Sequence, residues 1–242
     1  MKRSVWKRRG VLTGAFLALA VLIGLTVKTV QADSWYDLSG GTLTVYDGTT
    51  EIPDRAFMNK TDIQKVILPE SLRTIGNQAF QGCTNLDEID LPEGLTRIGY
   101  CAFEQCSDLE EVTLPASLTD FDNSSGAPFN NCASLKAVKV VKGNQSYKSV
   151  DGVLFTADGT ELCQYPAGKE ETTYAVPDGT ETIGRSSFKG NSYLVTVHLP
   201  ESVIKIDIRA FKLCDKLCDV ELPDSVDAIG EGAFEETGSL KP

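Results

Sequence analysis

The sequence has very little histidine, since its 242 residues contain only His198. A single imidazole excludes any zinc site that needs two or more histidine ligands. No C-x₂-C pair is present either, because Cys214 and Cys218 are four residues apart and Cys101 and Cys106 are five apart. The sequence also lacks G-x-S-x-G, H-E-x-x-H, P-loop and EF-hand motifs. We therefore predict a protein that is not an enzyme and that holds no metal and no cofactor.

Positive charge is scarce beyond the N-terminus. Six of the 23 basic residues lie in residues 1–32, and the remaining 210 residues contain 17 basic and 34 acidic side chains, a net charge of 17 − 34 = −17. A hydrophobic content of 41% is typical of a globular chain. An acidic surface repels phosphate groups, so nucleic acid and anionic membranes are excluded as expected partners.

The N-terminal segment has the pattern of a targeting sequence. Five basic residues in positions 1–9 precede an uncharged, mostly apolar run from Val11 to Val27, and the small residue Ala32 stands before Asp33. This pattern predicts a signal peptide over residues 1–32 and a secreted or cell-surface protein with no membrane segment in its mature form. The alternative is an uncleaved anchor, because 17 residues are near the lower limit for spanning a bilayer.

Two short markers recur along the rest of the chain, mostly at intervals of 23 residues. A Leu-Pro or Val-Pro pair occurs at 68–69, 91–92, 114–115, 176–177, 199–200 and 222–223. A phenylalanine, often after alanine, occurs at Phe57, Phe80, Phe103, Phe129, Phe188, Phe211 and Phe234. A fixed period of this length indicates a solenoid of stacked coils, and these phenylalanines predict seven.

Each part of the repeat has a structural interpretation, which is clearest from Leu86 to Cys106. Apolar and polar residues alternate before Pro92, as in a strand with one buried face, and proline ends that strand. A second short extended segment ends at Ile98, and Gly99 permits the turn that follows. Phe103 is expected in a single helical or 3₁₀ turn with its ring in the centre of the coil.

The middle of the chain departs from the repeat. Asp158-Gly159 lies between two extended segments and predicts a β-hairpin. The sequence therefore divides into a signal peptide (1–32), an N-terminal capping strand segment (33–50), a first repeat block (51–141), a hairpin insertion (142–173) and a second repeat block (174–242).

The repeat LxxIxLPxxLxxIGxxAFxxC resembles the 23-residue, treponemal-type leucine-rich repeat of the BspA-like family, from about Thr42 to the end of the chain. The resemblance implies an α/β, strand-rich fold: a right-handed leucine-rich-repeat solenoid of about seven coils with a β-hairpin insertion. The last residues, 239–242, fall inside what would be the next strand. A truncated product and a last coil covered by a partner both fit this pattern.

Four cysteines share one position of the repeat, three residues after the phenylalanine: Cys83, Cys106, Cys132 and Cys214. Stacked coils would place them in a column about 4.8 Å apart, with parallel Cβ directions that suit a disulfide poorly. We expect a structural ladder of buried thiols rather than disulfides.

The BspA-like family includes bacterial surface adhesins that bind matrix proteins such as fibronectin and fibrinogen. The resemblance therefore implies a secreted or cell-surface protein that binds an extracellular or surface protein partner, with adhesion as one form of this activity. The concave face of the solenoid is the expected binding surface. Its outward positions supply the candidate partner-binding residues Lys65, Ile67, Glu88, Asp90, Glu111, Thr113, Lys139, Thr196, His198, Asp219 and Glu221.

The sequence is also compatible with two alternatives. The first is a structural envelope protein that assembles with copies of itself, against the expectation of a monomer or weak self-association. The second is a carbohydrate-active envelope protein, because carboxylate pairs such as Glu88 and Asp90 would suit glycosidase chemistry if they flanked a cleft.

Overall fold

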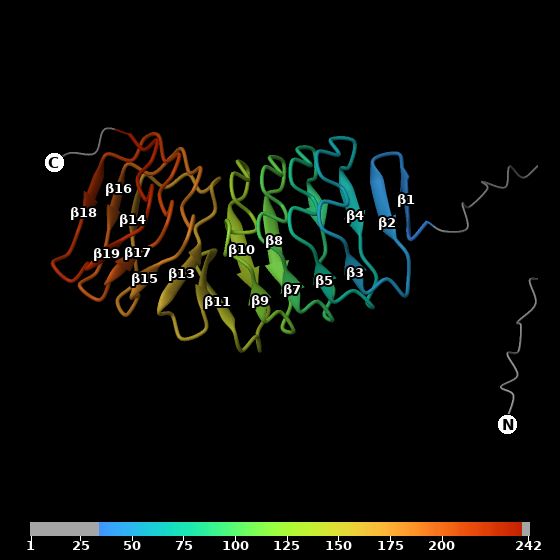
Figure 1. Cartoon of the computed structure of the whole chain (residues 1–242), viewed down its shortest axis with the longest axis horizontal. Coiled ribbons are helices and arrows are strands. Elements are labelled where there is room, and N and C mark those ends of the chain that lie inside the picture. Colours follow the sequence, from blue (N-terminus) through green and yellow to red (C-terminus); the bar gives the residue numbers. More distant parts are fainter. Residues whose placement is uncertain (1–33, 239–242) are drawn as a thin grey trace, which may run out of the picture. The chain divides into compact units, whose positions relative to one another are not determined.

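Short strands follow one another along a single axis in sequence order, as the colours of Figure 1 show. The computed structural model describes residues 34–238, and the described part from Trp35 onward belongs to one compact unit. The predicted signal peptide lies outside the described residues. Within them, no helix is long and apolar enough to cross a membrane.

Each coil contributes two strands to the fold. The first, here called the LP strand, ends near the Leu-Pro position, and the second, the IG strand, ends near the Ile-Gly position. The LP strands are β2 (Thr42–Val45), β4 (Lys65–Ile67), β6 (Glu88–Ile89), β8 (Glu111–Leu114), β10 (Ala137–Val140), β14 (Thr173–Ala175), β16 (Thr196–His198) and β18 (Asp219–Glu221). The IG strands are β3 (Glu51–Ile52), β5 (Thr74–Ile75), β7 (Arg97–Ile98), β9 (Asp120–Phe121), β13 (Glu161–Gln164), β15 (Thr182–Ile183), β17 (Lys205–Ile206) and β19 (Ala228–Ile229).

Parallel pairing in register with the repeat confirms the predicted solenoid. Lys65 pairs with Glu88 between β4 and β6, and Thr74 pairs with Arg97 between β5 and β7, so partners are one 23-residue period apart. The described residues form about eight coils, one more than the seven repeat phenylalanines predict. The missing coil contains Tyr165, which stands 23 residues before Phe188 and takes the place of a phenylalanine.

The repeat aromatic residues stack along the centre of the coils. Neighbouring ring centroids are 5.3 Å apart for Phe57 and Phe80 and 5.2 Å apart for Phe80 and Phe103, with interplanar angles of 19° and 6°. A second stack begins at Tyr165, whose ring lies 4.9 Å from that of Phe188. All of these side chains are at most 1% exposed, so each stack forms part of a core that a single coil could not bury alone.

The turn around each repeat aromatic is not helical, which corrects the expected helical or 3₁₀ turn, and residues 34–238 contain no helix. Gln78 and Gly82, two residues before and after Phe80, have φ values of 57° and 74°. Such left-handed residues cannot continue a right-handed helix. Their amides, and that of Phe80, donate to carbonyls of the next coil, so the turn segment is hydrogen-bonded between coils as a strand would be. The class is therefore a strand-rich solenoid without helices over these residues.

The N-terminal end of the stack is covered by a short strand. β1 (Tyr36–Ser39) pairs antiparallel with β2, the first LP strand. The rings of Trp35 and Tyr36 lie 5.4 Å and 4.9 Å from that of Phe57, the first ring of the stack. This segment therefore buries the apolar face of the first coil, the role expected of a cap.

A β-hairpin, β11 (Tyr147–Val150) and β12 (Val153–Thr156), is inserted in the fifth coil between its LP strand β10 and its IG strand β13. β12 and β13 pair antiparallel on either side of Asp158-Gly159, which confirms the predicted hairpin, and β11 adds a third antiparallel strand. Side chains of a strand alternate between its two faces. Accordingly, Leu154 packs in the first hydrophobic core, whereas Val153 and Phe155 pack in the second. The hairpin thus separates two cores.

A largely buried ion pair joins the two blocks across this division. Lys189 Nζ lies 2.8 Å from Glu104 Oε1, and the two side chains are 17% and 11% exposed. Glu104 also accepts hydrogen bonds from Gln81 Nε2 at 2.6 Å and Asn131 Nδ2 at 3.4 Å. Residues 85 positions apart in the sequence are therefore held together through one carboxylate.

Cys83, Cys106 and Cys132 stand in successive coils and form the expected ladder, whereas Cys214 lies three coils further on. The thiols of Cys83, Cys106, Cys132 and Cys214 each donate to a phenylalanine carbonyl of an earlier coil, at 3.1–3.3 Å. Burial raises the pKa of the Cys83 thiol to about 11 and that of Cys214 to about 12. These thiols are protonated hydrogen-bond donors of the core rather than reactive nucleophiles.

Candidate interaction surface

The candidate residues lie on the LP strands or, in the case of Asp90, directly after β6, at the positions where side chains alternate away from the core. Val66, between Lys65 and Ile67, is 2% exposed, while Ile67 is 45% exposed. The pairing registers place the candidates of adjacent coils beside one another, for example Lys139 beside Thr113 and His198 beside Glu221. The surface of the LP strands, here called the LP face, is therefore a regular array of outward side chains.

This array is divided into three sheets rather than being continuous. β2, β4 and β6 belong to one sheet, β8 and β10 to a second, and β14, β16 and β18 to a third. The structure therefore groups the candidates as Lys65, Ile67, Glu88 and Asp90; Glu111, Thr113 and Lys139; and Thr196, His198, Asp219 and Glu221. The second break coincides with the hairpin insertion, where the carbonyl of Gly152 accepts from the amide of Val138 at the edge of β10.

The first break, between β6 and β8, forms a groove of about 390 Å³. Its apolar lining comes from Ile89, Leu91, Pro115 and Val141, and its polar lining from Thr113 and six carboxylates. We call it the acidic groove, and its carboxylates are Asp87, Glu88, Asp90, Glu93, Glu110 and Glu111. A solvent-exposed rim of like-charged side chains around an apolar floor is typical of a surface that recognises an oppositely charged segment.

Lysines of the neighbouring strands neutralise half of this charge. Lys65 Nζ lies 2.5 Å from Glu88 Oε1, and the hydrogen bond from that carboxylate raises the pKa of Lys65. Lys139 pairs with Glu111 at 2.7 Å, and Lys136 pairs with Glu110 at 3.2 Å. These pairs are exposed and so contribute little to stability. Their effect is to relieve the repulsion between carboxylates of adjacent coils.

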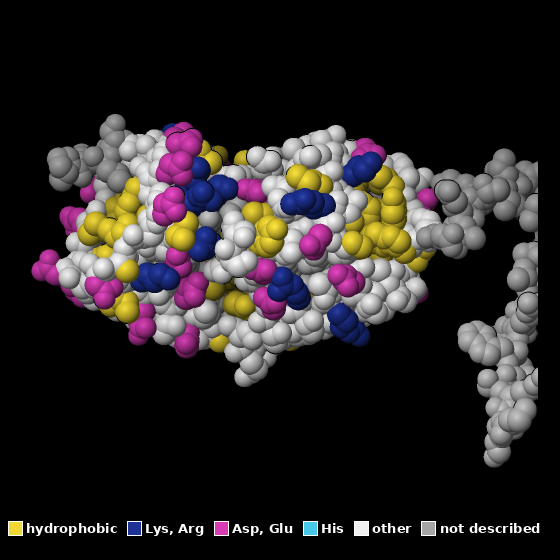
Figure 2. All heavy atoms as spheres, viewed as in Figure 1, with side chains coloured by type: hydrophobic (Ala, Val, Ile, Leu, Met, Phe, Trp, Pro, Cys, Tyr) yellow, Lys and Arg dark blue, Asp and Glu magenta, His cyan; other side chains and the backbone are white. Residues whose placement is uncertain are grey.

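Three groove carboxylates have no such partner. Within residues 34–238, Asp87, Asp90 and Glu93 form no ion pair, although Glu93 Oε2 accepts from the amide of Ala116 at 3.3 Å. The groove therefore keeps negative charge that a cation from a partner could meet. Figure 2 shows that charged side chains of both signs and separate apolar patches are spread over the face in view.

Asp87, Glu110 and Lys136 belong to this surface although the alternation along the strands does not predict them. Asp87 and Glu110 occupy equivalent positions of adjacent coils, each directly before the outward acidic residue of its strand. The signal that could have found them is the pair of runs Asp87-Glu88 and Glu110-Glu111 at the same phase of the repeat. Strict alternation along a strand predicts an inward side chain at that position, whereas both carboxylates are exposed.

His198 is an exposed residue of β16, paired in register with Ala175 and Glu221. Within the described residues, no group of three or more His, Cys, Asp or Glu side chains is arranged to hold a metal ion. The candidate residues of the LP face are exposed or half-buried, and many of them are charged.

This arrangement of parallel LP strands, stacked aromatics and hydrogen-bonded turns defines the class of the protein as a leucine-rich-repeat solenoid. The chain belongs to the BspA type leucine rich repeat family, whose repeat region matches in six copies over residues 26–155 and 168–242. The predicted family is thereby confirmed. No curated protein matches the sequence.

Solved structures of bacterial leucine-rich-repeat proteins are similar to this one. The pneumococcal vaccine antigen PcpA has a TM-score of 0.65 at 27% identity, with 83% of this chain and 61% of that chain covered. A leucine rich cell surface protein of Faecalibacterium prausnitzii has a TM-score of 0.63 at 27% identity, with 83% and 59% covered. A leucine-rich repeat protein of Eubacterium ventriosum has a TM-score of 0.71 at 22% identity, with the same coverage, and shows the fold alone. The chain spans about three fifths of the length of these relatives.

Proposed function

We propose that this is a secreted or cell-surface protein that binds another protein through its LP face, with the acidic groove as the main contact. The observation that carries the proposal is the groove between β6 and β8, where unpaired carboxylates surround an apolar floor. A partner segment with basic side chains beside an apolar one would complement both features. The export pattern of residues 1–32 and the surface location named for one structural relative support the localisation.

Adhesion to host or matrix proteins is the form of binding that the family favours. The acidic groove fits this role because it would attract basic segments and steer their approach at low salt. The proposal is one of binding and not of catalysis, in keeping with the open array of side chains on the LP face. No nucleic acid is proposed as a partner, because the net charge of residues 33–242 is −17 (17 − 34).

The test is binding of the purified chain from residue 33 to a panel of matrix proteins and glycans, at low and at physiological salt. We expect saturable binding to at least one protein, weaker at the higher salt because the contacts are between exposed charges. The groove variant replaces the three unpaired carboxylates: Asp87→Asn, Asp90→Asn and Glu93→Gln. We expect its affinity to fall at least about tenfold, through loss of the three charge pairs.

A matched control removes the same charge elsewhere. Asp47→Asn, Glu201→Gln and Asp227→Asn are all exposed and lie outside the acidic groove. Equal losses in the two variants would show that only net charge matters and would refute the assignment of the groove. Saturable binding of glycans with no protein binding would refute a protein partner.

A further inference from the structure

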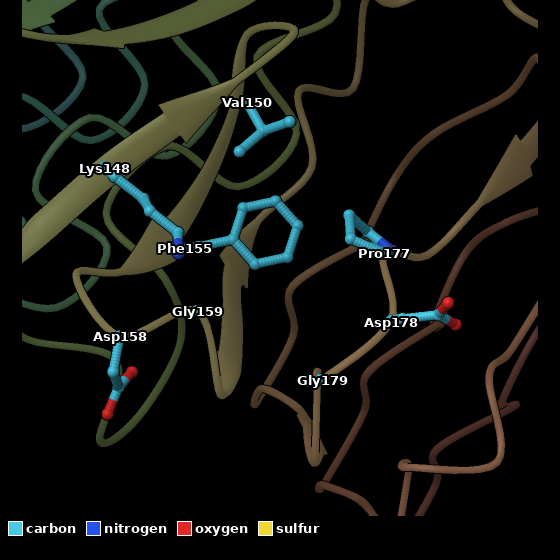
Figure 3. Close-up of a pocket in the computed structure, with 8 residues that line it drawn as sticks. All are labelled: Lys148, Val150, Phe155, Asp158, Gly159, Pro177, Asp178 and Gly179. Carbon is cyan, nitrogen blue, oxygen red and sulfur yellow. The ribbon is translucent and has the colours of Figure 1, made fainter.

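The inserted hairpin leaves a second pocket at the corner that follows β14. The pocket has a volume of about 130 Å³ and lies between the hairpin with its β12–β13 turn and the turn at Pro177 (Figure 3). We call it the hairpin pocket. Its lining residues are Lys148, Val150, Phe155, Asp158, Gly159, Pro177, Asp178 and Gly179.

The pocket lies at a corner that has no serine contact with the preceding coil, because Gly179 stands at the repeat position of Ser71 and Ser202. Between regular coils, a serine joins the two corners: the Ser71 hydroxyl donates to the carbonyl of Thr49 and accepts from the amide of Gly48. Gly179 has this contact with the following coil, through Ser202 Oγ at 3.1 Å. On the side of the preceding coil, Gly179 faces the hairpin and not another corner. A Cβ added at Gly179 would meet no atom within 4 Å.

The interior of the hairpin pocket is apolar. The ring of Phe155, which is 1% exposed, lies beside the side chains of Val150 and Pro177 in Figure 3. Val150 is 37% exposed, a large fraction for a valine beside a buried ring. The walls therefore expose apolar surface that a partner side chain could cover, and such covered pockets hold the anchor residues of protein interfaces.

The mouth of the pocket is charged, with an excess of carboxylates. Asp158 and Asp178 lie on opposite sides of the Phe155 ring in Figure 3, and both are exposed. The Lys148 ammonium lies over the β12–β13 turn, where a Cβ added at Gly159 would be 2.5 Å from its Nζ. Asp178, on the other side, forms no ion pair with any residue in 34–238.

We propose that the hairpin pocket receives one branched aliphatic side chain of a partner protein, from a segment in which a basic residue stands next to it. A volume of about 130 Å³ has room for one apolar side chain, because a cavity of about 150 Å³ holds one benzene. The Asp178 carboxylate forms an ion pair with the basic residue of the partner segment. The inference rests on the proposed function, because it adds an anchor for a protein partner at the hairpin, apart from the acidic groove.

The experiment uses short capped peptides as probes and the amide NMR spectrum of the chain from residue 33 as the readout. The probe is acetyl-Gly-Leu-Lys-Gly-amide, compared with peptides in which alanine replaces the leucine or glutamate replaces the lysine. We expect the leucine–lysine peptide to shift the amides of Val150, Gly159 and Gly179 and to bind about tenfold more tightly than the alanine peptide, because a buried leucine loses more apolar surface to the pocket.

Two protein variants make the result specific to the pocket. Val150→Trp fills the space from an exposed position, so it should abolish the shifts without unfolding the chain. Ile204→Trp is the matched control, because Ile204 is an exposed apolar residue, 45% exposed, that does not line the pocket. It should leave the shifts unchanged.

Each outcome decides the proposal separately from the proposed function. Shifts that need both leucine and lysine and vanish in Val150→Trp support the aliphatic anchor. Shifts at other sites, equal shifts with the alanine peptide, or no shifts overturn it. Those results would leave the acidic groove untouched, because groove binding is judged by the Asp87, Asp90 and Glu93 variant, which does not alter the hairpin pocket.

Discussion

Replacing Lys189 with methionine should weaken the connection between the two repeat blocks. The Lys189 ammonium is the only cation paired with the Glu104 carboxylate within residues 34–238, and both side chains are less than a fifth exposed. Methionine keeps most of the volume of the lysine stem but leaves the buried carboxylate without its charge partner. The structure therefore predicts a loss of stability from an uncompensated charge, and not from a cavity.

The magnitude follows from the remaining partners of Glu104. Removing one member of a buried ion pair typically costs about 3–5 kcal/mol. Glu104 keeps hydrogen bonds from Gln81 and Asn131, so the loss should be at the lower end, about 3 kcal/mol. The double variant Lys189→Met with Glu104→Gln has no buried charge left, and should lie within about 1 kcal/mol of the unaltered chain.

Urea unfolding followed by far-UV circular dichroism and by tryptophan fluorescence measures both effects. Trp35 is the tryptophan of the described residues, and it packs on Phe57 at the N-terminal end of the first core. Its fluorescence therefore reports the first block, whereas circular dichroism reports both. In Lys189→Met we expect the two curves to separate, because repeat blocks unfold independently once their contact is weakened. A single-variant loss below about 0.5 kcal/mol, or a double variant as unstable as the sum of its parts, would refute the reasoning.

Three further predictions concern single side chains. Tyr165→Phe should raise the free energy of unfolding, measured by urea titration, by about 1 kcal/mol, because the Tyr165 hydroxyl is buried without a hydrogen-bond partner. Phenylalanine also stands at the equivalent position of the other coils. A loss of stability would contradict this prediction. In the native protein at most the Cys218 thiol should react with a thiol-specific colorimetric reagent at mildly alkaline pH, because burial raises the pKa of the other six thiols. In urea all seven cysteines should react. Rapid reaction of several thiols in the native protein would contradict this prediction. Hydrogen bonds from Thr156 and Thr160 lower the pKa of Asp158 from 3.8 to about 2, so the stabilising effect of the ionised carboxylate is present above pH 4 and is lost as the pH falls towards 2. The variant Asp158→Asn should therefore have a lower melting temperature than the unaltered chain at pH 7 and the same melting temperature at pH 2. An equal difference in melting temperature at both pH values would contradict the assignment.

Much of the fold could be predicted because each coil repeats the same physical solution. The apolar residues of one unit cannot be buried alone, so a constant spacing of Leu-Pro and phenylalanine markers implies stacked coils. The number of coils predicted from the phenylalanines was one too low, because the fifth coil lacks a Leu-Pro pair and carries Tyr165 in place of phenylalanine. The predicted helical turn is wrong because residues such as Gln78 adopt positive φ values. This conformation goes together with hydrogen bonds between coils, which the sequence of one coil does not reveal.

The candidate surface was predictable as a set of outward positions but not as a site. Alternation along each strand placed Glu88 and Glu111 on the LP face. The repeat period implies that all LP strands form one sheet, and it contains no signal for the break between β6 and β8 that creates the acidic groove. The hairpin pocket likewise arises where the period is interrupted, so its shape depends on how Phe155 and Pro177 meet in three dimensions.

The most direct test of the proposed function is hydrogen–deuterium exchange of the chain from residue 33, with and without the matrix protein that binds it best. The account predicts slower exchange in residues 87–93 and 110–115, which form the two walls of the acidic groove, and no change in residues 219–221 of β18. Protection confined to β14, β16 and β18, or no protection on any LP strand, would contradict it.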